Sequence, residues 1–174
     1  MGKKITPYLF FLAVFLLFPA VLPAQDDPAD SSAFRSTTYP LPRFVSLGSD
    51  KVYVRTGPGQ RYPIKFLYKK SGLPVEVILE YEAWRKIRDQ EGDEGWVHKS
   101  LLSGRRTGLI RSEDLVSVYQ KPKTEARIVA YIEPNAIGGL KECQDGWCTF
   151  ESAGYKGWVE TKYIWGVYEG EDFD

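Results

Sequence analysis

The two cysteines of this chain, Cys143 and Cys148, stand five positions apart in the segment CQDGWC. Thiols at this spacing could bind a metal, form a redox pair, supply a nucleophile or form a structural disulfide. A structural zinc site needs four ligands, and two thiols supply only half of them. A disulfide is therefore favoured, while the redox and nucleophilic roles stay open as alternatives.

The residues between the cysteines favour a tight hairpin. Asp145 and Gly146 form a strong two-residue turn signal, because a type I′ turn needs positive φ at both central residues. Such a turn places Cys143 directly opposite Cys148, in the non-hydrogen-bonded pair whose Cα atoms lie close enough for a disulfide. The closed loop is short, so the chain-entropy relation gives a stabilisation of only about 2 kcal/mol.

Other residues that could do chemistry are few. His98 is the only histidine, which limits any Cys-His or Ser-His mechanism to one base. Four carboxylates lie close together in the sequence: Asp89, Glu91, Asp93 and Glu94. In an exposed hairpin their pKa values would not separate as acid–base catalysis requires. We expect a non-enzyme with no catalytic residue, no metal site and no cofactor.

Aromatic and basic residues are better candidates, and their expected role is binding. If Ile87 and Phe150 face the core, strand alternation turns Trp84 and Trp147 outward. An outward Trp flanked by polar residues can stack on a sugar ring or a proline, although packing within the protein remains an alternative. The predicted ligand-binding residues are Tyr53, Arg55, Tyr62, Trp84 and Trp147.

An internal repeat organises the chain around these residues. Residues 82–102 and 145–164 align, with Trp84 matching Trp147 at an offset of 63. The same offset takes the two cysteines to Glu80 and Arg85, opposite charges that could form a cross-strand ion pair worth roughly 0.2–1 kcal/mol. A steady offset indicates two tandem copies of one small module.

Each copy reads as short strands rather than helices. Residues 73–81, 84–89 and 94–99 are rich in β-branched, aromatic and charged residues, and Gly, Pro and Asp separate them. About 60 residues with about five such strands favour a small, strongly bent barrel. The predicted fold class is therefore all-β, with two tandem small barrels.

Two segments of the first copy, VYVRTGPGQRYPI and EAWRKIRDQEGDEGWVHKSLLSGRRTGLI, closely resemble the bacterial SH3-like domain family in its exported tandem form. In the second copy, CQDGWCTF, GYKGWV and YIWGVY are similar to the usual ending of that family. The resemblance covers roughly residues 44–168 and implies SH3-like barrels with a binding role in the cell envelope. One departure is Tyr53, which stands where the family usually has Asn.

The N-terminal segment predicts export. Lys3 and Lys4, an apolar run, and small residues before Gln25 form the pattern of a signal peptide over residues 1–24. The run is shorter than a membrane span, so no stable span is expected after cleavage, and the body would lie in the periplasm or cell envelope. The expected domains are a flexible leader (25–43), SH3-like domains at 44–106 and 107–168, and a frayed acidic tail (169–174).

Charge narrows the class of partner. The chain carries 23 basic and 23 acidic residues, which argues against nucleic acid. Residues 44–111 hold 13 Lys or Arg against 8 Asp or Glu. The favoured partner is a cell-wall polymer, the peptide or glycan of peptidoglycan, bound in an aromatic and basic groove of the first copy. The alternative is an envelope protein, recognised through a proline-rich segment or by strand addition; the oligomeric state is left open.

Overall fold

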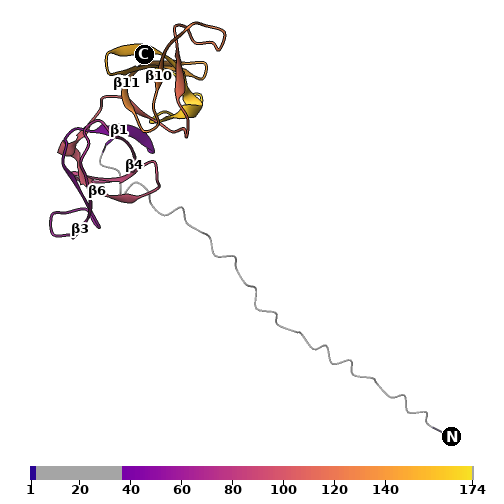
Figure 1. Ribbon diagram of the computed structural model, residues 1–174. Helices are drawn as coiled ribbons and strands as arrows, with labels where there is room; N and C mark the ends of the chain where they lie inside the picture. The colour runs from indigo at the N-terminus through magenta and orange to yellow at the C-terminus, as the bar shows by residue number, and fades with distance from the viewer. Residues whose placement is uncertain (3–36, 174) are drawn as a thin grey trace. The chain divides into compact units, whose positions relative to one another are not determined.

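The structure is a computed structural model that describes residues 1–2 and 37–173. Apart from residues 1–2, the predicted signal peptide lies outside the described residues, as do residues 25–36 of the predicted leader. The described part is built from strands, which form two barrels drawn from purple to rose and from orange to yellow in Figure 1. None of its helices has the length and hydrophobicity needed to cross a membrane.

The first barrel is a sheet of seven strands in the order β3-β2-β6-β5-β4-β1-β7. Its strands are β1 (Arg43–Leu47), β2 (Val52–Arg55), β3 (Ile64–Tyr68), β4 (Pro74–Tyr81), β5 (Trp84–Arg88), β6 (Glu94–His98) and β7 (Leu102–Ser103). A single 3-10 turn, η2 (Lys99–Leu101), joins the last two strands.

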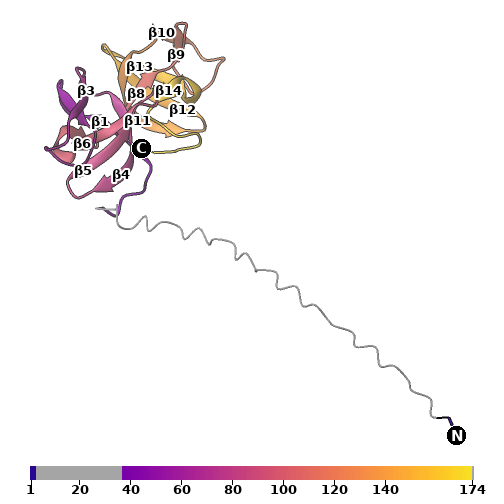
Figure 2. The same cartoon turned by 90° about the horizontal axis from the view of Figure 1, so that it is seen from below.

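The second barrel repeats this plan in the order β10-β9-β13-β12-β11-β8-β14. Its strands are β8 (Thr107–Ile110), β9 (Val116–Tyr119), β10 (Ile128–Ile132), β11 (Ile137–Gln144), β12 (Trp147–Ser152), β13 (Tyr155–Glu160) and β14 (Ile164–Trp165). The 3-10 turn η3 (Thr161–Tyr163) takes the place of η2. Figure 2 shows β13, β9 and β10 as neighbours within this barrel.

Strand register confirms the tandem repeat and the all-β fold. Val45 pairs with Val75 in the first barrel, and Gly108 pairs with Gly138 in the second, at the predicted offset for both partners. Because the same residues face each other in both copies, positions can be compared between the barrels one by one.

Each barrel has its own apolar core, formed by alternate residues of its strands. The first core consists of Leu47, Val52, Val54, Val75, Val77, Ile87 and Val97, all nearly inaccessible to solvent. The second consists of Ile110, Val116, Val118, Leu140, Cys143, Cys148, Phe150, Val159, Ile164 and Val167. Ile87 and Phe150 are thus core residues, as the alternation predicts.

Aromatic side chains also link one barrel to the other. The ring of Phe44 lies 5.1 Å from the ring of Trp165 and 4.7 Å from that of Tyr168. The Tyr168 hydroxyl donates a hydrogen bond of 2.8 Å to Glu76. Burial, followed by this hydrogen bond, raises the pKa of Tyr168, so the hydroxyl remains a donor at physiological pH.

The expectation of a frayed acidic tail is wrong for residues 171–173. The backbone of Phe173 exchanges two hydrogen bonds with Cys143, at 2.7 and 3.0 Å. The Glu171 carboxylate accepts bonds of 2.7 and 3.1 Å from the guanidinium of Arg106, which also lies 4.3 Å from the Phe173 ring. A charged, partly buried partner holds this tail in place, and sequence composition does not reveal that partner.

Candidate functional site

The Asp145-Gly146 turn brings the two cysteines together. Both turn residues have positive φ, at 49° and 80°, as a type I′ turn requires. Cys143 lies opposite Cys148, and the two form a disulfide with a Cα–Cα distance of 4.1 Å. Cys148 is fully buried in the second core, so the pair is a structural disulfide that links the two strands of the hairpin.

The equivalent corner of the first barrel holds an ion pair in a buried setting. Glu80 lies opposite Arg85, and its carboxylate is 3.1 Å from the Arg85 guanidinium. Arg43 and Thr37 also donate to this carboxylate, which is 0% exposed. Residues 37–43, expected to form a flexible leader, therefore contribute directly to the buried network. The estimate for an exposed cross-strand pair does not apply to a group in this environment.

The candidate binding surface is the outer face of β2, β6 and β5, on the side opposite the first core. Arg55 lies opposite Trp96, which in turn lies opposite Lys86 on β5. Trp84 lies opposite His98 in the next row. Side chains at directly opposite positions share a face, so two tryptophans and two basic residues occur on one surface.

The loop between β2 and β3 forms one border of this face. The Arg55 guanidinium donates hydrogen bonds to the carbonyl oxygens of Gln60, at 3.0 Å, and Tyr62, at 2.7 Å. The Tyr62 ring packs over Gly57, where an added Cβ would lie 2.4 Å from a ring carbon. The Arg61 guanidinium lies over the same ring, 5.3 Å from its centroid. Arg55 therefore orders the loop through its backbone oxygens.

Trp84 and Tyr53 are both accessible on this surface. The Trp84 indole is half-buried and meets the His98 ring edge to face, with centroids 5.5 Å apart. Tyr53 is 39% exposed, and the ammonium group of Lys51 lies 5.4 Å from its ring. Of the predicted residues, the structure brings Arg55 and Tyr62 into direct contact. No ring contact joins Tyr53 or Tyr62 to Trp84 among the described residues.

Trp147 occupies the position of Trp84 in the second barrel. Its half-buried indole meets the ring of Tyr119 at 5.5 Å, with the two planes nearly perpendicular. It therefore lies on a separate surface from the other four predicted residues. Tyr119 stands where the first barrel has Arg55, because each pairs with the tryptophan of its GWV strand.

Sequence reasoning missed two contributors to the first surface. Trp96 is buried, at 9% exposure, but it alternates with the core residue Val97 and so lies on the outer side of the sheet. His98 supports Trp84 while its Nδ1 lies 2.7 Å from the Ser100 hydroxyl. The signal for both was strand alternation around Val97, which places its two neighbours on the outer side.

The carboxylate cluster forms a turn and an ion pair. Asp89 accepts hydrogen bonds from the Tyr68 hydroxyl at 2.7 Å and from the backbone amides of Glu91 and Asp93. Lys86 contacts Glu94 at 2.5 Å, and this hydrogen bond lowers the pKa of Glu94. Within residues 1–2 and 37–173, no group of three or more His, Cys, Asp or Glu side chains is arranged to hold a metal.

Comparison with known proteins adds a family and a relative. The family described as bacterial SH3 domain matches this chain twice, at residues 48–104 and 112–166. A curated protein of Bacillus subtilis (strain 168), named N-acetylmuramoyl-L-alanine amidase YrvJ, is 22% identical over 178 residues. That match covers 94% of this chain and 31% of the relative, so the chain spans about a third of the relative's length.

Two solved structures from Trichomonas vaginalis, NlpC1 and NlpC2, are each 15% identical to this chain. Each match covers 76% of this chain, and 49% of NlpC1 or 50% of NlpC2, with TM-scores of 0.34 and 0.33. At these scores neither structure bears on the function of this chain.

Proposed function

Since this chain belongs to the bacterial SH3 domain family, we propose that it is an exported, non-catalytic module that binds a cell-wall component. The ligand is the peptide or the glycan of peptidoglycan. Similarity to a protein named as an amidase of N-acetylmuramoyl-L-alanine supports a wall ligand. The observation that carries the proposal is the outer face of β2, β6 and β5, with its aromatic rings and ordered loop.

This face suits a polymer ligand for physical reasons. Trp84 is supported on one side by His98 and leaves part of its indole free for stacking. Tyr53 and Tyr81, each 39% exposed, extend the aromatic surface on either side. Because Arg55 already orders the neighbouring loop, ligand binding would cost little conformational entropy there.

A non-catalytic role agrees with the contacts of the groups that could catalyse. His98 bonds to Ser100 and packs on Trp84, while Asp89 is occupied by two backbone amides and a tyrosine hydroxyl. A general base needs an accessible acceptor beside the substrate, and these contacts use the acceptor atoms for structure.

The test is co-sedimentation of residues 25–174 with purified, protein-free peptidoglycan sacculi. We expect the wild type to pellet at micromolar concentration and Trp84→Ala to remain in the supernatant. Tyr155→Ala is the matched control, because Tyr155 is a surface aromatic of the second barrel with 64% exposure. If the wild type does not pellet, or if both variants lose pelleting equally, the proposed face is wrong.

A second candidate function rests on the edge strand β10. The sequence of this strand, IVAYI, contains no charge, and Ile128, Val129 and Tyr131 are 39%, 40% and 62% exposed. Edge strands usually carry charges that prevent pairing, so an uncharged apolar edge favours strand addition by a protein partner. In crosslinking from intact cells, Val129→Lys should remove such a partner, whereas Leu115→Lys, at an exposed apolar residue outside the strands, should not.

A further inference from the structure

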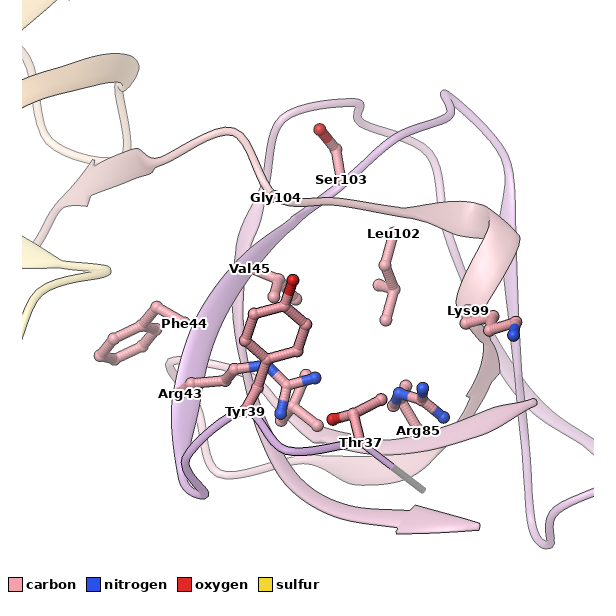
Figure 3. A pocket seen from close by; sticks show the side chains of 11 residues that line it. Thr37, Tyr39, Arg43, Phe44, Val45, Arg85, Lys99, Leu102, Ser103 and Gly104 are labelled. Atoms are coloured by element: carbon pink, nitrogen blue, oxygen red, sulfur yellow. The ribbon is translucent and has the colours of Figure 1, made fainter. Parts of the chain in front are cut away.

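The first barrel contains a cavity of about 520 Å³ at one end, away from the outer face described above. Its lining residues are Thr37, Tyr39, Arg43, Phe44, Val45, Val77, Arg85, Lys99, Leu102, Ser103 and Gly104. In Figure 3, Arg43, Leu102 and Arg85 lie inside the ring of strands, while Phe44 points away. Tyr39 also lines the cavity but is largely exposed to solvent. The volume falls within the roughly 300–1,000 Å³ of small-molecule sites.

The walls of this cavity combine apolar surface with positive charge. Val45, Val77 and Leu102 supply the apolar part, and three cations line the same space. Arg43 and Arg85 share the single buried carboxylate of Glu80. Lys99 is exposed and makes no ion pair with any described residue, so the cavity keeps an excess of positive charge.

The second barrel lacks this combination at the equivalent positions. Cys148 stands in place of Arg85, Thr161 in place of Lys99, and Gly108 in place of Val45. A Cβ added at Gly108 would lie 2.5 Å from Ile164, so core side chains fill the space there. The cations and the cavity are therefore features of the first barrel rather than consequences of the fold.

One equivalent cation remains in the second barrel, where it holds a carboxylate of the chain's own tail. Arg106 stands in place of Arg43, and both oxygens of the Glu171 carboxylate accept hydrogen bonds from its guanidinium. An aromatic ring stacks on each arginine, Phe173 on Arg106 and Tyr39 on Arg43. The tail thus places a carboxylate and an apolar group together at this site in the second barrel.

We propose that the cavity of the first barrel binds a small organic carboxylate with an apolar body. The three lining cations Arg43, Arg85 and Lys99 would attract the carboxylate through charge-assisted hydrogen bonds, and the body would pack against Val45, Val77 and Leu102. This inference goes beyond the proposed wall binding, because the cavity shares no residue with the outer face.

The probes for the test are three molecules with the same alkyl chain: octanoate, octanol and octylamine. In calorimetric titration of the exported chain at pH 7, we expect octanoate to bind at least tenfold more tightly than octanol. Octylamine, which is positively charged at this pH, should not bind. Equal affinity for octanoate and octanol, or no heat with octanoate at millimolar concentration, would overturn the proposal.

Variants locate the binding. Lys99→Gln should weaken octanoate binding severalfold and leave octanol binding unchanged, while Lys162→Gln, in the corresponding 3-10 turn of the second barrel, should change neither. Val45→Phe, which fills the cavity, should weaken both ligands, with circular dichroism as the check on folding. If octanoate affinity survives Lys99→Gln unchanged, the site is not this cavity. Trp84→Ala should keep octanoate binding, so failure of wall binding and failure of this proposal are distinguishable.

Discussion

Replacing Glu80 with glutamine should lower the free energy of unfolding by about 3–5 kcal/mol at pH 7. The carboxylate is 0% exposed, and it is the counterion that Arg43 shares with Arg85, whose side chain is only 6% exposed. An uncharged amide would leave these guanidinium groups without their counterion in a poorly solvated environment. The size of the loss follows from burial, since an exposed pair would contribute only about 0–1 kcal/mol.

The same ion network predicts how stability changes with pH. Burial alone would raise the pKa of Glu80, but the hydrogen bonds from Arg43 and Thr37 and the charges of both arginines lower it to about 2. Compared with the ordinary value of 4.5, this fall corresponds to about 3 kcal/mol of stability. Because the unfolded chain binds the proton more tightly, the contribution is complete above pH 4.5 and is lost as the pH falls toward 2.

The assay is urea unfolding followed by tryptophan fluorescence between pH 7 and pH 2.5. The difference in free energy of unfolding between wild type and Glu80→Gln should shrink as the pH falls, because protonated Glu80 resembles glutamine. Glu82→Gln is the control, since Glu82 is an exposed carboxylate in the same hairpin and should change stability by less than about 0.5 kcal/mol. The reasoning would be refuted if the free energies of unfolding of wild type and Glu80→Gln differed by less than about 1 kcal/mol at pH 7. It would also be refuted if this difference did not change with pH.

Three further outcomes can be measured. Replacing both Cys143 and Cys148 with alanine should cost about 2 kcal/mol or more in urea unfolding, and reductant should then have no further effect on the variant. Gly57→Ala should displace the Tyr62 ring and weaken sacculus pelleting, while a change of more than about 2 kcal/mol in the free energy of unfolding would point to misfolding instead. Phe173→Ala should increase hydrogen exchange at the Cys143 amide, and unchanged protection would show that the tail contact is unimportant.

The strands could be predicted from the sequence because their signals are local. Residues 73–81, 84–89 and 94–99 were expected as strands, and the structure has Pro74–Tyr81, Trp84–Arg88 and Glu94–His98. Alternating burial and turn residues carry this information within a few positions. The hairpin that pairs the cysteines was predictable for the same reason, since its two turn residues fix the register.

The environment of each charge could not be predicted, because it depends on distant segments. The sequence places Glu80 beside Arg85, but burial of the pair comes from Thr37 and Arg43, about 40 residues earlier. The cavity at the end of the first barrel could not be predicted for the same reason, since its lining residues come from four separate parts of that barrel. Periodicity reports which face a residue occupies, and it carries no information about which remote segment covers that face.

The two copies solve one structural problem in different ways, and the difference bears on where function lies. In the second barrel, the Cys143–Cys148 disulfide links the two strands of the hairpin and packs in the apolar core, so no charge has to be desolvated. In the first barrel, the buried ion pair of Glu80 and Arg85 links the equivalent strands. Burying these charges costs desolvation energy that a purely structural link, such as the disulfide, would avoid. Charged side chains in the first barrel line both the outer face and the end cavity, whereas the second barrel uses its equivalent arginine to hold its own tail. Ligand binding by the first barrel and stabilisation by the second follow from this asymmetry as our proposed division of roles.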